Sequence, residues 1–527
     1  MTGVLAVPAA ATITPPSIEY GQLAPMLVVF AAAVVGVLVE AFVPRPLRRA
    51  VQIVLSLAAL AASFVWTIVV AASHQIFADG SPGHVAAAGA VAVDRPTLFI
   101  QGTILVLAFA SVLLIADSSV SPFAAQAAAP PGSPEEREGL AAGIMHTEIF
   151  PLTMFAVGGM LLFPAANDLL TMFVALEILS LPLYLLCGLA RRRRLLSHEA
   201  SMKYFLLGAF SSAFFLFGVA MLYGFSGSVS LSAIASAAAT NNSNSTLLYA
   251  GIALLGLGLL FKIGAVPFHA WKPDVYQGSP TPITALMASC TLVAAFGALL
   301  RVFYVAFGQL TWDWRPAMWA VAIATMLVGS IIAITQTDMK RLLAYSSIAQ
   351  AGYILTGVIA ANTAGLSGSM FYLVAYGFAT IGAFAIVTLV RDRGGEAAHM
   401  SSWAGLGKRS PLIAGVFALF LIAFAGIPLT SGFTSKFAVF NAAIQGGALP
   451  LVVVGSISSA ILAFPYVRVI VLMFFSEPAL EGPVVVRPSA YTGLAVAIGA
   501  AVTVVLGVIP QPLLNLANHA ASQLFVR

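Results

Sequence analysis

Long apolar runs, separated by short polar or proline-rich stretches, dominate the chain from about residue 23 onward. A helix needs about 20 apolar residues to cross the hydrocarbon core of a bilayer. Runs of that length predict fourteen spanning helices, near residues 23–43, 51–73, 97–116, 148–165, 168–190, 199–224, 247–268, 280–308, 315–335, 340–361, 366–391, 411–445, 449–475 and 488–510. The pattern therefore predicts an all-α polytopic membrane protein.

The composition supports this fold class and argues against a nucleic-acid partner. Only 8% of the 527 residues are charged and 60% are hydrophobic, whereas a soluble globular protein carries about 25% charged residues. The net charge of +5 could suggest nucleic acid, but excess Lys and Arg in a membrane protein more often mark cytoplasmic loops. We expect the lipid bilayer, and no nucleic acid, to surround this chain.

Polar stretches divide the chain into candidate regions. Residues 118–147 form an Ala/Pro/Gly-rich polar loop that separates an N-terminal region with three spans, residues 1–117, from the rest. The last span and tail occupy residues 476–527. Between them lie ten spans, which the broken helices described below divide into two groups of five.

Basic residues predict the orientation. Loops on one side hold most of them, namely Arg45, Arg48, Arg49, Arg137, Arg191 to Arg194, Lys272, Lys340, Arg341, Arg391, Arg393, Lys408, Arg409 and Arg487. The opposite loops hold little beyond Arg95 and Arg315. The positive-inside rule makes the first side cytoplasmic, so we expect both termini outside.

Glu177 lies deep in an apolar run, residues 168–190. An ionised carboxylate at that depth costs at least about 2.5 kcal/mol and is a functional candidate by default. Lys262 and Lys436 also lie at membrane depth, with Arg468 and Lys203 as further candidates. Burial weakens the hold of a lysine on its proton and a nearby carboxylate restores it. The groups therefore suit a switchable proton store, or alternatively a structural ion pair that sets helix register.

Two of the predicted spans contain helix breaks. Pro267 follows Lys262 in GAVPFHAWK, and Pro428 precedes Lys436 in AGIPLTSGFTSK. A proline inside a span breaks the helix, and the freed backbone is tolerated only against protein or a water-filled cavity. Interrupted helices seven and twelve predict two inverted five-helix repeats, residues 148–308 and 315–475.

Three further side chains could take part in a water path. His269 directly follows the first break and could relay protons or cap freed carbonyls. Tyr372 and Tyr376 lie four residues apart on one helical face. They either line a hydrated path or pack in the core, and core packing is the commoner arrangement.

Redox chemistry has no signature in the sequence. There is no phosphate loop, no GxGxxG after a strand, no cysteine set for an iron–sulfur cluster and no paired His for haem. The two cysteines, Cys187 and Cys290, lie in apolar runs and are expected in the core. We expect the chain to carry no electrons itself.

The segments ALEILSLPLYLL, SHEASMKYFLLGAFSSAFFLFGVAMLYG, FKIGAVPFHAWKPDVYQGSPTPIT, DMKRLLAYSSIAQAGY and GIPLTSGFTSKF resemble the antiporter-like subunits of respiratory complex I. The stretch DVYQGSPTPIT and the EILSLPLY helix are more similar to the N type of the bacterial NADH–quinone oxidoreductase than to the L or M types. The resemblance covers nearly the whole chain from about residue 23.

The resemblance implies one proton route per subunit. It makes Glu177 the fifth-helix glutamate, with Lys203, Lys262 and Lys436 as the lysines of helices six, seven and twelve. The chain departs from the family at Leu292, which aligns with an eighth-helix lysine. The link between the two repeats would then run through water, His269, or Tyr and Ser hydroxyls, or it would be weaker than is usual in the family.

The resemblance also implies a setting. It places the chain in a bacterial plasma membrane as a membrane-arm subunit, beside subunits of the K and M types, with NADH, FMN, iron–sulfur clusters and quinone held by partner subunits. Alternative functions are a subunit of a multisubunit cation/proton antiporter, which shares the fold, or a structural membrane scaffold.

Overall fold

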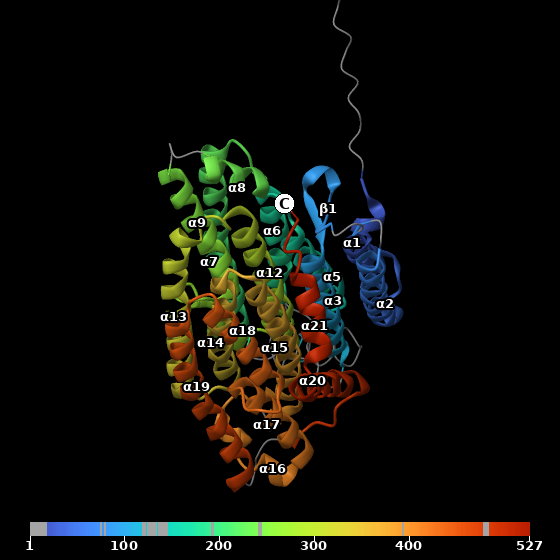
Figure 1. The fold of residues 1–527 in the computed structure, drawn as a ribbon. Coiled ribbons are helices and arrows are strands. Elements are labelled where there is room, and N and C mark those ends of the chain that lie inside the picture. Colours follow the sequence, from blue (N-terminus) through green and yellow to red (C-terminus); the bar gives the residue numbers. More distant parts are fainter. Residues whose placement is uncertain are drawn as a thin grey trace, which may run out of the picture.

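The computed structural model describes residues 18–526, except 74–75, 78–80, 119–122, 124–133, 135–145, 191–193, 241–244, 393–394 and 478–483. These residues form a bundle of helices packed side by side (Figure 1). Twelve helices in the described part are long and apolar enough to cross a membrane. They are α1 (Tyr20–Phe42), α2 (Arg45–Ala71), α3 (Arg95–Ala116), α6 (Leu169–Cys187), α7 (Arg194–Ser226), α9 (Ser245–Ile263), the continuous helix Thr281–Ala306, α13 (Thr311–Thr335), α14 (Met339–Ala360), α15 (Thr363–Leu389), α19 (Leu449–Phe475) and α20 (Ala490–Val508).

The two other predicted spans are shorter or divided. Helix α5 (Ile149–Leu162) continues only by a 3₁₀ turn to Ala165. The predicted span 411–445 is a pair of helices, α17 (Pro411–Ala425) and α18 (Ser431–Gln445). Every predicted span thus has a helical counterpart, but only twelve meet the length criterion within the described residues. The count of fourteen stays a prediction.

Three helices form the centre of the bundle. Nearly all residues of α14, α15 and the helix Thr281–Ala306 are buried, because other helices pack around them on their several faces. The helix Thr281–Ala306 consists of α11 (Thr281–Leu286) and α12 (Leu292–Arg301), with π-helical turns at Met287–Thr291 and Val302–Ala306. One π-helical turn therefore ends directly before Leu292.

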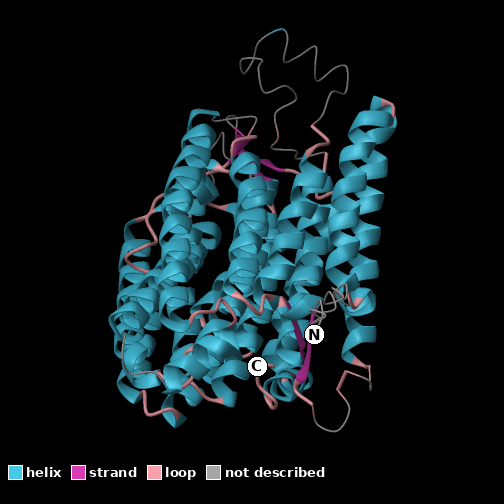
Figure 2. Ribbon diagram, turned by 90° about the horizontal axis from the view of Figure 1, so that it is seen from above, coloured by secondary structure: helices cyan, strands magenta, loops and turns pink. Residues whose placement is uncertain are grey.

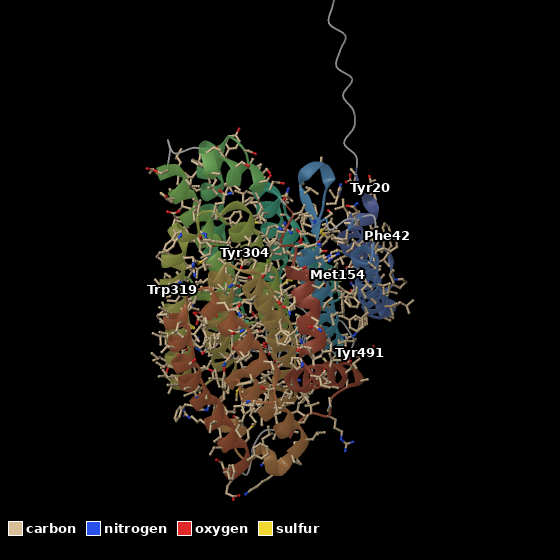
Figure 3. The ribbon with its side chains drawn as sticks, in the orientation of Figure 1. Tyr20, Phe42, Met154, Tyr304, Trp319 and Tyr491 are labelled. Carbon is tan, nitrogen blue, oxygen red and sulfur yellow. The ribbon has the colours of Figure 1, made fainter. Side chains whose placement is uncertain are left out.

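Outer helices expose apolar side chains. Phe42 is 81% exposed and Tyr20 66%, and both project from the edge of the bundle (Figure 3). Apolar residues also remain exposed along α7 and α19, including Phe210 and Phe464. A bilayer or neighbouring membrane helices are the surroundings that accept such a surface.

Several short elements were not predicted from the sequence. The helices are α8 (Leu231–Thr240), α10 (Trp271–Gly278), α16 (Leu406–Arg409) and α21 (Gln511–Ala521), with 3₁₀ turns at Ala87–Gly89 and Met400–Trp403. The strands are β1 (Gly83–Ala86), β2 (Val91–Asp94), β3 (Val390–Asp392), β4 (Gly395–Glu396) and β5 (Val484–Val485). Strands β1 and β2 form an antiparallel hairpin with Gly83 opposite Asp94, and β3 lies between β4 and β5. Figure 2 shows the strands in two small groups beside the helices.

Both described ends of the chain lie beside the β1–β2 hairpin. The Ala87 amide donates to Glu19 Oε2 at 3.0 Å, and the Val526 amide donates to Asp94 Oδ2 at 3.1 Å. The C-terminal end is correspondingly drawn near β1 in Figure 1. The two ends therefore share one side of the bundle.

Only some of the basic residues that were predicted to lie in loops can be compared with loops of the structure. Arg45, Arg48 and Arg49 lie in the first turns of α2, which begins six residues earlier than predicted. Arg137, Arg191 to Arg193, Arg393 and most of the loop 118–147 lie outside the described residues. The bounds of the predicted regions and repeats stay predictions.

Candidate functional site

Lys262 is buried within the first half of the bundle. It lies one residue before the end of α9 and is 4% exposed. Its Nζ donates to Ser180 Oγ of α6 at 2.7 Å and to Tyr204 OH of α7 at 3.5 Å. The ammonium also lies over the ring of Tyr184, 5.8 Å from its centre. The prediction that Lys262 is buried is confirmed, and hydroxyls and ring faces supply its surroundings.

Glu177 lies on α6, one turn before Ser180, and forms no ion pair with Lys262 in the described structure. Its Oε1 is buried and has no hydrogen-bond partner among the described residues. The Ser180 hydroxyl, on the same helix as Glu177, accepts from Lys262 Nζ and donates to the Leu176 carbonyl. An unpaired carboxylate beside a buried ammonium makes each group sensitive to the charge of the other.

Lys203 does not join this pair. Its Nζ contacts Asp274 Oδ2 at 2.6 Å and Glu199 Oε1 at 2.7 Å, and its side chain is 40% exposed. Asp274 also binds Arg341 Nη1 at 2.6 Å. The sequence places Lys203 near Glu177, but the structure puts it in a rim cluster with Asp274, because α10 begins directly beside α7.

The first helix break begins at Gly264 rather than at Pro267. Gly264 has φ +78, a left-handed conformation that favours glycine, and α9 ends there. Side chains from α10 bind two carbonyls in the last turn of α9: Trp271 Nε1 donates to the Phe261 carbonyl at 3.0 Å and Lys272 Nζ to the Ile263 carbonyl at 3.0 Å. Lys272 was assigned to a cytoplasmic loop from the sequence. Lys272 lies instead in helix α10 and is 1% exposed, so its assignment to a loop is wrong.

The second break has the same construction. Gly426 has φ +80 and ends α17. Lys436 Nζ, from α18, donates to the carbonyls of Phe424 at 3.0 Å and Ala425 at 2.9 Å, and to Ser459 Oγ at 2.7 Å. Gln350 Nε2 donates to the Phe424 carbonyl at 2.9 Å. The freed carbonyls of the broken helix therefore provide the binding site for the ammonium.

The position of Lys272 at the first break, and not that of Lys262, matches the position of Lys436 at the second break. A Cβ added at Gly264 would lie 2.7 Å from Lys272 Cδ, and one added at Gly426 would lie 2.9 Å from Lys436 Cδ. In each break a lysine from the second half-helix reaches back over the glycine that ends the first. Pro267 and Pro428 lie in the connecting segments after these glycines. Interrupted helices seven and twelve are confirmed, but the comparison of Lys262 with Lys436 is not.

The predicted accessory residues are separated by the fold. His269 is half-buried in the first connecting segment, and its Nδ1 has no hydrogen-bond partner among the described residues. Tyr372 and Tyr376 are both buried on α15. Tyr372 OH donates to Gln350 Oε1, so Tyr372 is connected through Gln350 to the second break. Leu292 is 2% exposed and brings no titratable group to the eighth helix.

Sequence reasoning missed a fully buried ion pair. Arg301 Nη2 contacts Asp94 Oδ2 at 2.7 Å, and both side chains are 0% exposed. Arg301 Nε donates to the Pro164 carbonyl at 2.7 Å, and the ring of Phe525 covers the guanidinium at 4.7 Å. The available signal was Arg301 itself, a charged residue inside the apolar run 280–308. Lys340 is likewise buried, 3.5 Å from Glu396 Oε2, rather than exposed in a loop.

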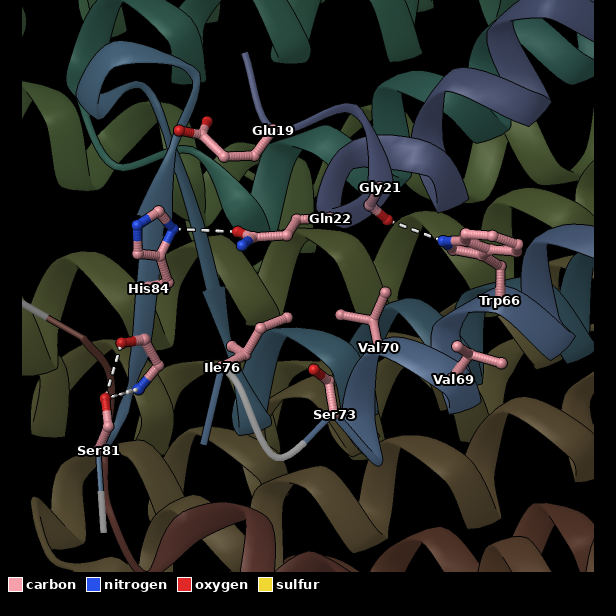
Figure 4. A pocket seen from close by; sticks show the side chains of 11 residues that line it. Glu19, Gly21, Gln22, Trp66, Val69, Val70, Ser73, Ile76, Ser81 and His84 are labelled. Carbon is pink, nitrogen blue, oxygen red and sulfur yellow. Dashed lines mark hydrogen bonds between the residues drawn. The ribbon is translucent and has the colours of Figure 1, made fainter. Parts of the chain in front are cut away.

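A surface pocket lies beside the β1–β2 hairpin, and neither Glu177 nor a buried lysine lines it. It measures about 540 Å³ and lies between α1, α2 and the β1 strand, lined by residues that include Glu19, Trp66 and His84. His84 Nδ1 lies 3.0 Å from Gln22 Oε1, and Trp66 Nε1 donates to the Gly21 carbonyl at 2.7 Å (Figure 4). The described residues contain no group of three His, Cys, Asp or Glu side chains that could hold a metal ion.

Comparisons with known proteins agree on one family. A family model described as NADH:quinone oxidoreductase/Mrp antiporter, TM, matches residues 166–462, more than half of the chain. NADH-quinone oxidoreductase subunit N of Rhodococcus opacus is 62% identical over 97% of this chain and 97% of its own, and that of Mycobacterium tuberculosis is 58% identical over 97% and 99%.

Solved structures share the fold. A chain of respiratory complex I from Thermus thermophilus with bound aureothin superposes with a TM-score of 0.74 at 30% identity, covering 94% of this chain and 99% of that chain. A chain of the Mrp complex from Dietzia sp. DQ12-45-1b has a TM-score of 0.78 at 23% identity, covering 96% and 98%, which supports the fold alone. Because relatives of such high identity align along nearly their whole length, the chain belongs to the NADH-quinone oxidoreductase subunit N family.

Proposed function

We propose that this chain is an antiporter-like membrane-arm subunit of a proton-pumping NADH–quinone oxidoreductase, and that it moves protons through Glu177, Lys262 and Lys436. The observation that carries the proposal is the pair of buried lysines, one near each helix break. Neither lysine forms an ion pair with a described carboxylate, and both bind hydroxyls or freed carbonyls. A buried lysine in such surroundings can gain or lose its proton when the charge on a nearby group changes.

The Coulomb interaction between the charges of Glu177 and Lys262 sets the free-energy scale of the proposed change in protonation. Two unit charges 4 Å apart interact by about 4 kcal/mol at an effective dielectric near 20, and about 1.4 kcal/mol corresponds to a ten-fold change in proton affinity. When Glu177 takes up a proton, Lys262 loses the charge that stabilises its ammonium and holds its own proton less strongly. Lys262 then passes a proton or a change of charge toward the second half, where Lys436 responds.

Electron transfer belongs to partner subunits of the same assembly, which hold NADH, FMN, iron–sulfur clusters and quinone. We propose that subunits of the K and M types flank this chain in the bacterial plasma membrane, and that both termini face outside. The exposed apolar side chains along the outer helices support burial against lipid and neighbouring subunits. The excess of basic residues in the sequence segments predicted as cytoplasmic loops supports the orientation.

A multisubunit cation/proton antiporter shares this fold, but relatives named NADH-quinone oxidoreductase subunit N are 57–62% identical to the chain. The likeness to the Mrp chain is 23% identical. The proposed function therefore follows the subunit N relatives.

Substitution Glu177→Gln tests the proposal in the assembled complex. Inverted membrane vesicles are supplied with NADH, proton uptake is followed with a pH-sensitive dye, and complex content is measured on native gels. We expect normal assembly with proton uptake lowered relative to NADH oxidation. Unchanged uptake would refute the relay, and failed assembly would favour a structural scaffold. Glu477→Gln, which alters an exposed carboxylate bound to Lys408, is the matched control.

A further inference from the structure

The chain has no lysine at position 292 of the eighth helix, yet it buries a lysine elsewhere between the two helix breaks. Lys272 is 1% exposed, on the short helix α10 that follows the first break. Resting on the proposed function, we propose that Lys272 is a further proton-carrying residue of this subunit, linking Lys262 in the first half to Lys436 in the second.

The hydrogen bonding of Lys272 is incomplete for an ammonium. A lysine ammonium has three donors. In the described structure Lys272 Nζ makes one hydrogen bond, to the Ile263 carbonyl, and forms no ion pair. Lys436 in the equivalent position has three acceptors within 3.0 Å. Because buried donors are costly to leave without partners, Lys272 loses fewer hydrogen bonds than Lys436 when it gives up its proton.

Groups around Lys272 determine its response to charge. On its own helix, Tyr276 places its ring 5.7 Å from the ammonium, and His269 precedes it in the connecting segment. From α9, Lys262 lies one residue before the carbonyl that Lys272 binds. Charged side chains of the packed helices α7 and α14 are engaged at the rim instead, where Asp274 binds both Lys203 and Arg341.

A series of buried polar side chains leads from Lys272 toward the second half of the bundle. Tyr276 is 1% exposed, and the Ser347 hydroxyl of α14 lies near the hydroxyls of both Tyr276 and Tyr376. Ser347 Oγ is buried without a hydrogen-bond partner among the described residues. A water molecule beside it would join the two phenols, since unpaired buried hydroxyls are the usual partners of internal water.

The last part of the connection is made by direct hydrogen bonds. Tyr372, one turn before Tyr376 on α15, donates to Gln350. Gln350 donates to the Phe424 carbonyl, which also accepts from Lys436. Polar side chains thus lie along a route from the first break to the second that does not use the eighth helix. The steps from Lys272 to Tyr276 and from Tyr376 to Tyr372 would need water.

The proposed step moves one proton and no electrons. Lys272 in its ammonium form breaks one N–H bond and gives the proton to a water molecule on the side of Tyr276. The water becomes hydronium and Lys272 is left as the neutral amine. The amine then forms a new N–H bond with a proton arriving from the Lys262 side. The positive charge is thereby moved toward Lys436 and Lys272 is restored.

Substitution Lys272→Gln tests this role in the assembled complex, because Gln still donates a hydrogen bond to the Ile263 carbonyl but binds no proton. A positioned proton-transfer group contributes about 100-fold or more to its step. We therefore expect the proton uptake that depends on this subunit to slow at least about ten-fold, while complex content stays normal. Lys408→Gln, at an exposed lysine, is the control and should leave uptake unchanged.

Rescue separates a proton-carrying role from a capping role. Adding Leu292→Lys to Lys272→Gln should restore part of the uptake, because it returns a titratable group to the eighth helix. Unchanged uptake in Lys272→Gln would overturn the inference. If that variant does not assemble, Lys272→Arg decides, since arginine keeps the charge and the donors but does not release a proton. Normal uptake in Lys272→Arg, or failed assembly of both variants, would reduce Lys272 to a structural cap.

The result can be distinguished from that of Glu177→Gln. Loss of uptake in Glu177→Gln with normal uptake in Lys272→Gln would overturn the role of Lys272 alone. The opposite result would remove Glu177 from the relay and support Lys272.

Discussion

Ser180 Oγ lies 2.7 Å from Lys262 Nζ, one helical turn along α6 from Glu177. This contact connects the helix that carries the glutamate to the helix that carries the lysine. It also supplies a hydroxyl dipole to an ammonium that has no carboxylate partner within ion-pair distance in the described structure.

Substitution Ser180→Ala should slow proton uptake while leaving assembly intact. A hydrogen bond to a charged group contributes about 1.5–3 kcal/mol, and its loss destabilises the charged form of Lys262 relative to the neutral amine. We expect uptake per NADH oxidised to fall by about ten-fold or more in the part that depends on this subunit. Ser201→Ala is the control, because Ser201 donates to the Tyr184 carbonyl and touches no lysine. Equal effects of the two variants would contradict the prediction.

Substitution Gly426→Ala should damage the second break. The left-handed φ of +80 costs an L residue roughly 1–2 kcal/mol, and the new Cβ would lie 3.0 Å from Lys436 Nζ. We expect faster thermal inactivation of the complex and weaker proton uptake. Gly415→Ala in the same helix α17 meets nothing within 4 Å and should be neutral or slightly stabilising. A Gly426→Ala complex as stable as the Gly415→Ala complex would rule out this account of the break.

Substitution Lys203→Met should affect proton uptake less than Glu177→Gln does. Lys203 is bound to Asp274 and Glu199 at the rim and is 40% exposed, and exposed ion pairs contribute only about 0–1 kcal/mol. The measurement is the same vesicle assay with both variants at matched complex content. A loss as large as that of Glu177→Gln would return Lys203 to the relay and imply that it moves toward Glu177 during turnover.

Substitution Arg301→Met should impair folding rather than proton transfer. Removing one partner from a buried ion pair costs about 3–5 kcal/mol, here by leaving Asp94 charged at 0% exposure. We expect less assembled complex and a lower Tm, with uptake per assembled complex unchanged. The double variant Asp94→Leu with Arg301→Met should recover part of the stability, because it removes both charges. Normal assembly of Arg301→Met with reduced uptake would instead place Arg301 in the proton route.

Part of the candidate site could be predicted from the sequence because it depends on local patterns. Glu177, Lys262 and Lys436 are recognisable as charges inside apolar runs, and the broken helices follow from GAVPFHAWK and AGIPLTSGFTSK. The glycines that end the half-helices could not be separated from the prolines by pattern alone. Left-handed backbone at Gly264 and Gly426 is a property of the folded chain.

Burial of the other lysines could not be predicted in this way. Lys272 stands beside polar residues in WKPDVYQ, and such a stretch is typical of a loop. Only the packing of α10 against α7 and α14 buries it. The same limit applies to Asp94 and Arg301, which are 207 residues apart in sequence and meet only through the fold.

The sequence by itself determined that this is a polytopic membrane protein with two interrupted helices and charges at membrane depth. The reason is that the length of an apolar run, and the scarcity of charged residues within it, can be read from consecutive residues. The tertiary structure decided which of those charges meet. It moved Lys203 to the rim, buried Lys272 at the first break and made it the counterpart of Lys436. The physical reason is that contacts between helices depend on how side chains from distant segments pack, whereas a segment's preference for the membrane depends on its own residues.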